Sequence, residues 1–184
     1  MRSIISGVAG VGKSTILYLV EKGTNYDIIN FGTLMYEMAR DIGLIAHRDE
    51  LRKLNVDTQI NLQKKASNAI GQMDEVIVDT HMSIRSPKGY IPGLPEWVLR
   101  ELKINSYFVI ESDYKEIKKR RASDSNRFRD EESEDDIKLH QELNRYFVAA
   151  YAIYSAATVN FVNNVQDAPE VAANEIIRKL MKND

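Results

Sequence analysis

The chain contains no cysteine among its 184 residues. A disulfide scaffold, a thiol nucleophile and a cysteine-ligated zinc or iron–sulfur site are therefore excluded, and the composition suits a reducing cytoplasm. An excess of charge of one sign is also absent, because the formal net charge is −2. We therefore expect neither nucleic acid nor an anionic membrane surface among the partners of this protein.

Long hydrophobic runs are absent as well. The small apolar residues that follow Met1 and Arg2 are interrupted by glycines and by Lys13, unlike the apolar core of a signal peptide. Residues 147–162 lean towards apolar side chains but include Tyr, Ser, Thr and Asn, and they fall short of a bilayer span. With 43% hydrophobic and 28% charged residues, the chain is expected to fold as one soluble, cytoplasmic domain.

A phosphate-binding motif is present near the start of the chain. Residues 7–14 read Gly-Val-Ala-Gly-Val-Gly-Lys-Ser, which satisfies G-x-x-x-x-G-K-[ST]. Residues 3–6 predict a buried strand before the motif, and apolar residues within 16–20 predict a helix after it. A chance match in a glycine turn is the alternative, but the strand–loop–helix context favours a site for a nucleoside triphosphate.

The residue types in this motif explain its chemistry. Glycines let successive backbone N–H groups turn towards phosphate oxygens, and the helix dipole adds partial positive charge there. Lys13 can reach the β- and γ-phosphates, and the Ser14 hydroxyl can ligate Mg²⁺. The candidate nucleotide-binding residues in this motif are Gly7, Val8, Ala9, Gly10, Val11, Gly12, Lys13, Ser14 and Thr15.

Short apolar runs alternate with helical segments along the rest of the chain. The candidate strands are residues 2–6, 27–30, 75–79, 107–111 and 158–162. Their continuous apolar character is typical of strands buried on both faces of a parallel sheet. This order predicts an α/β fold in which ligands bind at the carboxyl ends of the strands.

Three pairs of residues predict helix starts, since each places a capping side chain three positions before an acid. These pairs are Asp113 with Glu116, Ser133 with Asp136, and Asp167 with Glu170. After Ser133 a long helix is expected, and its apolar residues at three- and four-residue spacing, from Leu143 to Tyr154, are expected mainly in the core. A subunit interface is the alternative for this apolar face.

Residues 80–95 contain three of the four prolines and two glycines. A long loop of this composition after a central strand is more often functional than not. We therefore expect a functional loop beside the phosphate site.

Arginines gather in three regions that are expected at loops or helix ends. Arg48 and Arg52 are four residues apart, which predicts one face of a helix, and Arg85 lies in the proline-rich loop. The third group comprises Arg120, Arg121, Arg127 and Arg129. Arginine binds phosphate through paired donors, so the set favours a second phosphate-bearing substrate under a lid. Solvated surface arginines are the alternative reading of any single position.

The charge order around the third group supports the lid. Five basic residues within 115–121 precede six acidic residues within 130–136. The acids weaken a nucleic-acid interpretation, whereas a flap that closes on phosphates explains both halves. A solvated charged hairpin is the simpler alternative.

Asp79 ends the apolar run Val-Ile-Val-Asp, where a carboxylate can hold Mg²⁺ directly or through water. A plain strand-end aspartate is the alternative. His81 follows two residues later. Because a phosphate acceptor is already anionic at neutral pH and needs no strong base, we expect His81 to be a structural, hydrogen-bonding residue.

Taken with these residues, the chain resembles the archaeal-type adenylate kinases nearly end to end. The resemblance rests on the phosphate loop, on residues 30–37 (Asn-Phe-Gly-Thr-Leu-Met-Tyr-Glu) and 48–54 (Arg-Asp-Glu-Leu-Arg-Lys-Leu), and on Asp79-Thr80-His81. It rests most specifically on residues 86–95, Ser-Pro-Lys-Gly-Tyr-Ile-Pro-Gly-Leu-Pro, and also on the lid pattern Arg127-x-Arg129. Ala9 and Ser86 depart from the residues most common in that family, without removing a needed donor.

The resemblance implies reversible, Mg²⁺-dependent transfer of the ATP γ-phosphoryl group to AMP, which gives two ADP. It implies a P-loop fold with a five-stranded parallel sheet flanked by helices, an AMP-binding helical segment at about 30–73, a short lid at about 121–133 without a zinc module, and often a homotrimer. The implied AMP-site residues are Thr33, Arg48, Arg52, Arg85 and Arg145. The residues implied to act on the ATP side or with the lid are Lys13, Arg120, Arg127 and Arg129, and the implied Mg²⁺ ligands are Ser14 and Asp79.

Two other functions stay open. A kinase of the same fold could act on CMP, UMP, dTMP or a non-nucleotide acceptor, and it would differ within residues 33–52. A nucleotide-dependent switch is the second. Residues 164–167 lack the lysine of a guanine-reading Asn-Lys-x-Asp, which disfavours a GTPase. An ATPase with a regulatory role is harder to exclude, since small P-loop folds are reused in that way.

Overall fold

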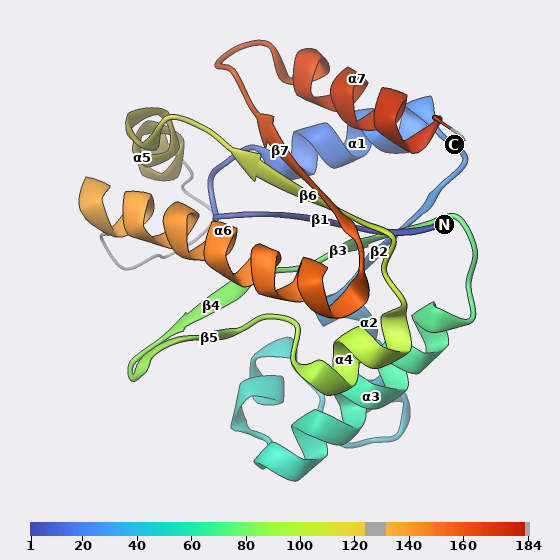
Figure 1. The fold of residues 1–184 in the computed structure, drawn as a ribbon. Coiled ribbons are helices and arrows are strands. Elements are labelled where there is room, and N and C mark those ends of the chain that lie inside the picture. Colours follow the sequence, from blue (N-terminus) through green and yellow to red (C-terminus); the bar gives the residue numbers. More distant parts are fainter. Residues whose placement is uncertain (124–131, 183–184) are drawn as a thin grey trace.

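The computed structural model describes residues 1–123 and 132–182. Its strands are β1 (Arg2–Gly7), β2 (Asp27–Asn30), β3 (Val76–Asp79), β4 (Ser83–Ser86), β5 (Gly89–Pro92), β6 (Ser106–Glu111) and β7 (Thr158–Asn163) (Figure 1). Its helices are α1 (Lys13–Gly23), α2 (Phe31–Asp41), the 3₁₀ helix η1 (Arg48–Lys53), α3 (Val56–Gly71), α4 (Glu96–Leu102), α5 (Tyr114–Ser123), α6 (Glu134–Ser155) and α7 (Pro169–Leu180).

Five strands form one parallel sheet in the order β2-β3-β1-β6-β7. All five predicted strands are confirmed, with ends that differ by one residue at most. β1 lies at the centre, with β3 on one side and β6 on the other. The chain therefore leaves β1 towards one edge of the sheet and later fills the other edge, and this reversal opens a crevice at the carboxyl ends of the strands.

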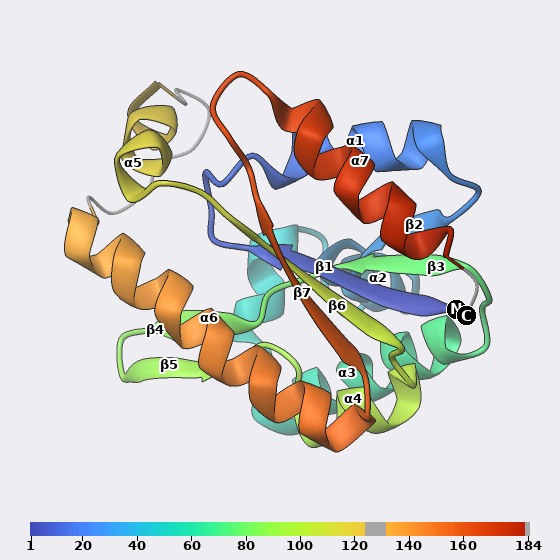
Figure 2. The same cartoon turned by 45° about the horizontal axis from the view of Figure 1, so that its top comes forward.

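Each face of the sheet carries its own apolar core. Side chains alternate along a strand, so the neighbours Ile4 and Ile5 of β1 are both fully buried but belong to different cores. Helices α1 and α7 cover one face, and α4 and α6 cover the other (Figure 2). With both faces covered, the continuous apolar runs of the central strands are explained.

The segment 80–95 is not the irregular loop that its composition predicted. Residues 83–86 and 89–92 form an antiparallel hairpin, with Arg85 opposite Tyr90. The hairpin lies apart from the main sheet, below α6 in Figure 1. Gly89 has φ of 120°, which permits the turn, and the Ser86 hydroxyl donates to the Gly89 carbonyl at 2.7 Å. The prolines and glycines of this segment therefore lie at the ends and the turn of two short strands.

Two of the three predicted helix starts are confirmed. Ser133 and Asp136 exchange both hydrogen bonds of a capping box at the start of α6, and α5 begins directly after Asp113. The third is wrong, because α7 begins at Pro169 and its capping position, Ala168, has no side-chain bond. Pro169 fixes the first helical turn there instead.

The core prediction for α6 is only partly right. Tyr151 is buried, whereas Ala150 and Tyr154 are exposed. Across the described ranges 1–123 and 132–182, no helix has both the length and the apolarity needed to cross a membrane.

Candidate active site

The phosphate loop joins β1 to α1. Gly10 and Gly12 have φ of 84° and 94°, so both need the left-handed backbone that glycine adopts without strain. Gly12 is the cap of α1 and supplies no side-chain hydrogen bond. The backbone N–H groups at this helix end therefore have no side-chain cap, which is the arrangement that the predicted anion site requires.

Three side chains hold the loop from behind. The Asn164 amide donates to the Val11 carbonyl at 2.7 Å, and Arg120 Nη1 donates to the same carbonyl at 3.1 Å. Arg121 Nε donates to the Ala9 carbonyl at 2.7 Å. The support of the phosphate loop by Asn164 and Arg121 was not predicted from the sequence. A polar residue just past a strand's carboxyl end was the available signal for Asn164.

Lys13 and Asp79 form an ion pair at the centre of the crevice. Their side chains are only 15% and 16% exposed, so solvent screens the pair weakly. Lys13 Nζ also donates to the Thr80 carbonyl at 3.3 Å. The second carboxylate oxygen of Asp79 accepts from Asn30 Nδ2 at 2.8 Å. This carboxylate is thus shared between the phosphate loop and the end of β2.

The oxygen ligands expected for Mg²⁺ are Asp79 and Ser14. Ser14 begins its helix beside Lys13, is exposed, and its hydroxyl has no hydrogen-bond partner among the described residues. No cluster of three or more His, Cys, Asp or Glu side chains suited to a metal occurs within that part of the chain. A hydroxyl and one carboxylate suit an ion that takes its other ligands from phosphate and water, which is how Mg²⁺ usually binds.

The predicted acceptor residues lie across the crevice from the phosphate loop. Thr33 lies in the first turn of α2, where its N–H and hydroxyl both bond Asn30 Oδ1, at 2.9 and 3.0 Å. Arg48 Nη2 approaches the same oxygen at 3.4 Å. Arg52 does not share a face with Arg48 as predicted, because the 3₁₀ helix has three residues per turn and separates positions four apart by about 120°.

His81 follows β3 and lies near enough to Lys13, Asp79 and Arg52 for their charges to act on its ring. The residue as a whole is exposed, although it also lines a small pocket and is partly surrounded by protein there. This burial, together with the positive charge of Lys13, lowers the pKa of His81 to about 4. No hydrogen bond of the His81 ring is found within the described residues, so its expected hydrogen-bonding role stays a prediction. Its neutral ring lines a small pocket between the phosphate loop and β4.

Arg85 lies on β4 and is held by acids from the start of α6. Its guanidinium lies 3.1 Å from Glu132 Oε1 and 3.6 Å from Asp136 Oδ1. The other carboxylate oxygen of Glu132 pairs with Arg121, which is bonded to the phosphate loop. Burial disfavours the charged form of Glu132, but the two guanidinium groups outweigh this and lower the pKa of the carboxyl. The Glu132 carboxylate therefore pairs with one arginine on each side of the crevice, Arg121 and Arg85.

Arg145 of α6 is a predicted acceptor-site residue that the structure does not bring to this crevice. Arg145 forms a two-bond ion pair with Glu111, at 2.6 and 2.5 Å, and stacks on Phe161 at 4.7 Å. These contacts are on the outer side of α6, so its predicted phosphate contact stays a prediction. Arg127 and Arg129 lie outside the described residues.

Fold and site together define a class of protein. A phosphate loop between the first strand and first helix of a parallel sheet, with a lysine and a strand-end aspartate above it, is the arrangement of the small P-loop kinases. Solved structures with this fold include the shikimate kinase of Acinetobacter baumannii, with a TM-score of 0.64 and 14% identity, covering 98% of this chain and 92% of that one. The shikimate kinase of Aquifex aeolicus has a TM-score of 0.57 and 21% identity, covering 98% and 96%. At such identities the likeness shows the fold alone.

Sequence relatives define the family. Residues 6–138 match the family described as the AAA domain. The adenylate kinase of Thermoplasma acidophilum is 53% identical over 178 residues, which cover 97% of each chain. That of Methanocaldococcus jannaschii is 42% identical over 185 residues, covering 96% of each. The chain belongs to the adenylate kinase family, and the sequence-based assignment is confirmed.

Proposed function

We propose that the chain catalyses reversible, Mg²⁺-dependent transfer of the γ-phosphoryl group of ATP to AMP, with two ADP as products. The observation that carries this proposal is the shared carboxylate of Asp79. It contacts Lys13 of the phosphate loop on one side and, through Asn30, the predicted acceptor residues on the other. Because the donor site and the acceptor site meet at the Asp79 carboxylate, the arrangement suits transfer of a phosphoryl group between two bound nucleotides.

On the donor side, the loop amides and Lys13 hold the ATP phosphates. Arg120 contributes to this side, because it bonds the loop at Val11 and also bonds Gln166, which follows β7, at 2.6 Å. Arg129 and Arg127 act from the lid at about 121–133, in keeping with the family resemblance. The positive charges offset the negative charge that the phosphates bring together.

On the acceptor side, AMP binds at Thr33, Arg48 and Arg52 within the helical segment at about 30–73. Thr33 and Arg48 support this assignment by their place beside Asn30, and Arg52 is near enough for its charge to act on His81. Arg85 binds the acceptor phosphate after it exchanges its carboxylate partners for phosphate oxygens. Arginine makes paired bonds to phosphate, which favours this exchange.

Ser14 and Asp79 are the residues that would hold Mg²⁺. The bound ion would neutralise phosphate charge and orient the phosphoryl group. Within the protein, catalysis rests on position and charge, with no covalent intermediate. The neutral His81 is not needed as a base, because the AMP phosphate is already an anionic nucleophile.

A nucleotide-resolved assay tests this proposal. Purified protein with Mg·ATP is offered AMP, CMP, UMP, dTMP, GMP or no acceptor, and products are separated by chromatography. AMP-dependent formation of two ADP per ATP, abolished by EDTA, is expected. If another nucleoside monophosphate is phosphorylated faster than AMP, that nucleotide and not AMP is the acceptor. Slow ATP hydrolysis that no acceptor changes would overturn kinase activity in favour of an ATPase.

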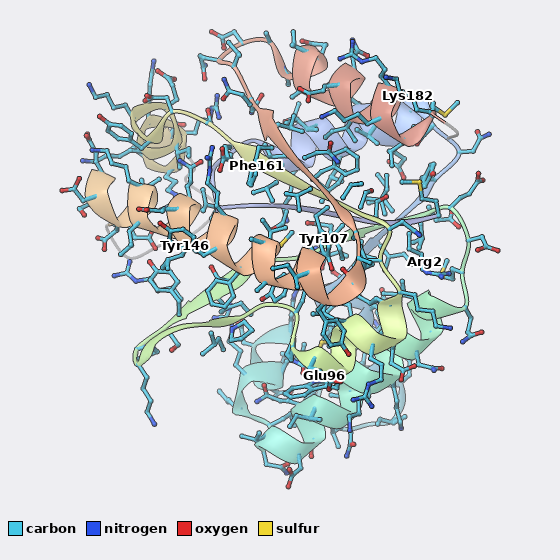
Figure 3. All side chains as sticks on the ribbon, in the orientation of Figure 1. Arg2, Glu96, Tyr107, Tyr146, Phe161 and Lys182 are labelled. Atoms are coloured by element: carbon cyan, nitrogen blue, oxygen red, sulfur yellow. The ribbon has the colours of Figure 1, made fainter. Side chains whose placement is uncertain are left out.

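Assembly as a homotrimer, as the resemblance implies, is supported by an exposed apolar face. Tyr146 and Ile153 of α6 are 62% and 85% exposed, and Phe161 of the edge strand β7 is 43% exposed. Tyr146 and Phe161, both labelled in Figure 3, line one groove together with charged side chains such as Glu111 and Arg145. Multi-angle light scattering at three times the chain mass would support the trimer, and a monomeric mass would refute it. A cytoplasmic location, proposed from the lack of cysteine and the nucleotide substrates, is tested by cell fractionation.

A further inference from the structure

Asn30 links the two halves of the crevice. It is the last residue of β2 and also the cap of α2. Its amide nitrogen donates to Asp79 Oδ2 at 2.8 Å, across 49 positions of sequence. Its amide oxygen accepts from the Thr33 N–H, the Thr33 hydroxyl and Arg48. A single planar amide thus fixes the spacing between the carboxylate and the acceptor residues.

The hydrogen-bond partners allow only one orientation of this amide. Asp79 is a carboxylate, which accepts but does not donate, so the nitrogen of Asn30 must face it. On the opposite side, Thr33 presents its backbone N–H and Arg48 presents guanidinium hydrogens, which require the oxygen. A rotation by 180° would place donors against donors and acceptor against acceptor. The orientation is therefore fixed at both ends.

We infer that Asn30 is a positioning residue for phosphoryl transfer: it fixes Asp79 against Lys13 and sets the distance between the phosphate loop and the acceptor site. This inference deepens the proposed function and rests on it for the identity of the two substrates. Asn30 need not touch either nucleotide. It acts by holding both sides at the separation that brings the reacting phosphates together, and small misplacements of reacting groups reduce rates strongly.

A role as a helix cap alone would not require the bond to Asp79. Asn55 shows this, because it caps α3 with the same geometry, accepting from the Thr58 N–H at 2.9 Å, and has no partner of the Asp79 kind within the described residues. Asn55 is exposed, and no role in the reaction is assigned to it. The chain therefore supplies its own matched control.

Steady-state kinetics on Asn30→Ser and Asn55→Ser separate the two roles. Serine caps helices about as well as asparagine, but its hydroxyl is too short to bridge Thr33 and Asp79. For Asn30→Ser we expect kcat to fall roughly ten- to a hundredfold, the effect of losing a hydrogen bond to a charged group, with KM for ATP and AMP changed less than about threefold. For Asn55→Ser we expect parent kinetics. A kcat within about twofold of the parent for Asn30→Ser would overturn the inference.

A stability measurement tests the link without any turnover. Melting temperatures are recorded in EDTA for Asn30→Ser, Asp79→Ala and the double variant. If the two side chains are bonded, the double variant should lose less than the sum of the single losses, by at least about 2 °C. Strict additivity would overturn the link. Asn55→Ser combined with Asp79→Ala should be additive, because these residues share no contact.

The two measurements also keep the outcomes apart. If the parent protein makes no ADP from ATP and AMP, the proposed function fails, and the melting cycle still decides whether Asn30 and Asp79 are coupled. If the parent is active and the cycle is additive, only the positioning role fails.

Discussion

Glu132 competes with substrate phosphate for two arginines, and replacing it should move stability and affinity in opposite directions. Its carboxylate pairs with Arg121 and with Arg85 at once, and its side chain is 19% exposed. Glu132→Gln keeps the size and hydrogen-bonding capacity of the residue but removes the charge. The substitution should destabilise the substrate-free protein while freeing Arg85 for the acceptor phosphate.

The magnitude follows from the burial of each pair. Arg121 is 12% exposed and is also bonded to the phosphate loop, so loss of its charged partner should cost about 1–2 kcal/mol of unfolding free energy after allowance for solvent screening. This corresponds to a fall in melting temperature of about 2–8 °C for a chain of this size. Arg85 is 45% exposed, so its pair is weak, and freeing it should raise AMP affinity only about two- to fivefold.

The pH dependence provides a second signature. The arginines lower the pKa of Glu132 below its ordinary value of 4.5, so its contribution to stability is complete above that pH and is lost as the pH falls through the lowered pKa. The parent and Glu132→Gln should therefore differ in urea midpoint at pH 7 and converge in stronger acid.

The assays are urea unfolding for stability and calorimetric titration of AMP in EDTA for affinity. Glu134→Gln is the matched control, because Glu134 pairs with Lys118 at 3.7 Å on an exposed surface. The control should change neither quantity measurably. Unchanged or weaker AMP binding in a well-folded Glu132→Gln protein would refute the competition between this carboxylate and phosphate.

Three further predictions concern the phosphate loop and its surroundings. Lys13→Ala should retain the fold by circular dichroism but lose turnover by a factor on the order of 10³ or more, since charge over the phosphates is removed; a loss below tenfold would contradict the donor assignment. Gly12→Ala should lower the melting temperature by about 2–8 °C and weaken ATP binding. A backbone φ of 94° costs a residue with a side chain about 1–2 kcal/mol, and the added methyl group meets the Asn164 amide. An unchanged melting temperature would show that the loop adapts. His81 has a folded pKa of about 4 against an ordinary 6.5, so the unfolded chain takes up its proton first and stability should fall between pH 6.5 and pH 4. Urea midpoints across this range should slope less in His81→Gln, and equal slopes would disprove the effect.

Local patterns predicted the main sheet because the information was local. Each of the five strands is a continuous apolar run, and the Ser133 capping box lies within four residues. The patterns failed where composition was ambiguous. Residues 80–95 contain enough proline and glycine to predict a loop. In the structure the prolines and glycines lie at the ends and the turn of two short strands. A spacing of four residues puts Arg48 and Arg52 on one face only in an α-helix, and this segment is a 3₁₀ helix.

The phosphate loop could be predicted because its glycines, lysine and serine are adjacent in the sequence and form one local motif. Asn164 and Glu132 were not included, because their roles depend on partners far away in sequence. Asn164 supports Val11 across 153 positions, and Glu132 joins a hairpin arginine to a helix arginine. A single sequence carries no signal that pairs such residues.

By itself, the sequence determined the class of this protein, the phosphate loop, the parallel sheet and the family. Those features depend on short-range chemistry: glycine conformations, apolar periodicity and the spacing of a lysine from a turn. Only the tertiary structure decided that Lys13, Asp79 and Asn30 meet at one point, although 66 and 49 positions separate Asp79 from the other two. The carboxyl ends of β1, β2 and β3 lie side by side, and sheet order, which no local pattern encodes, brings their polar residues into contact.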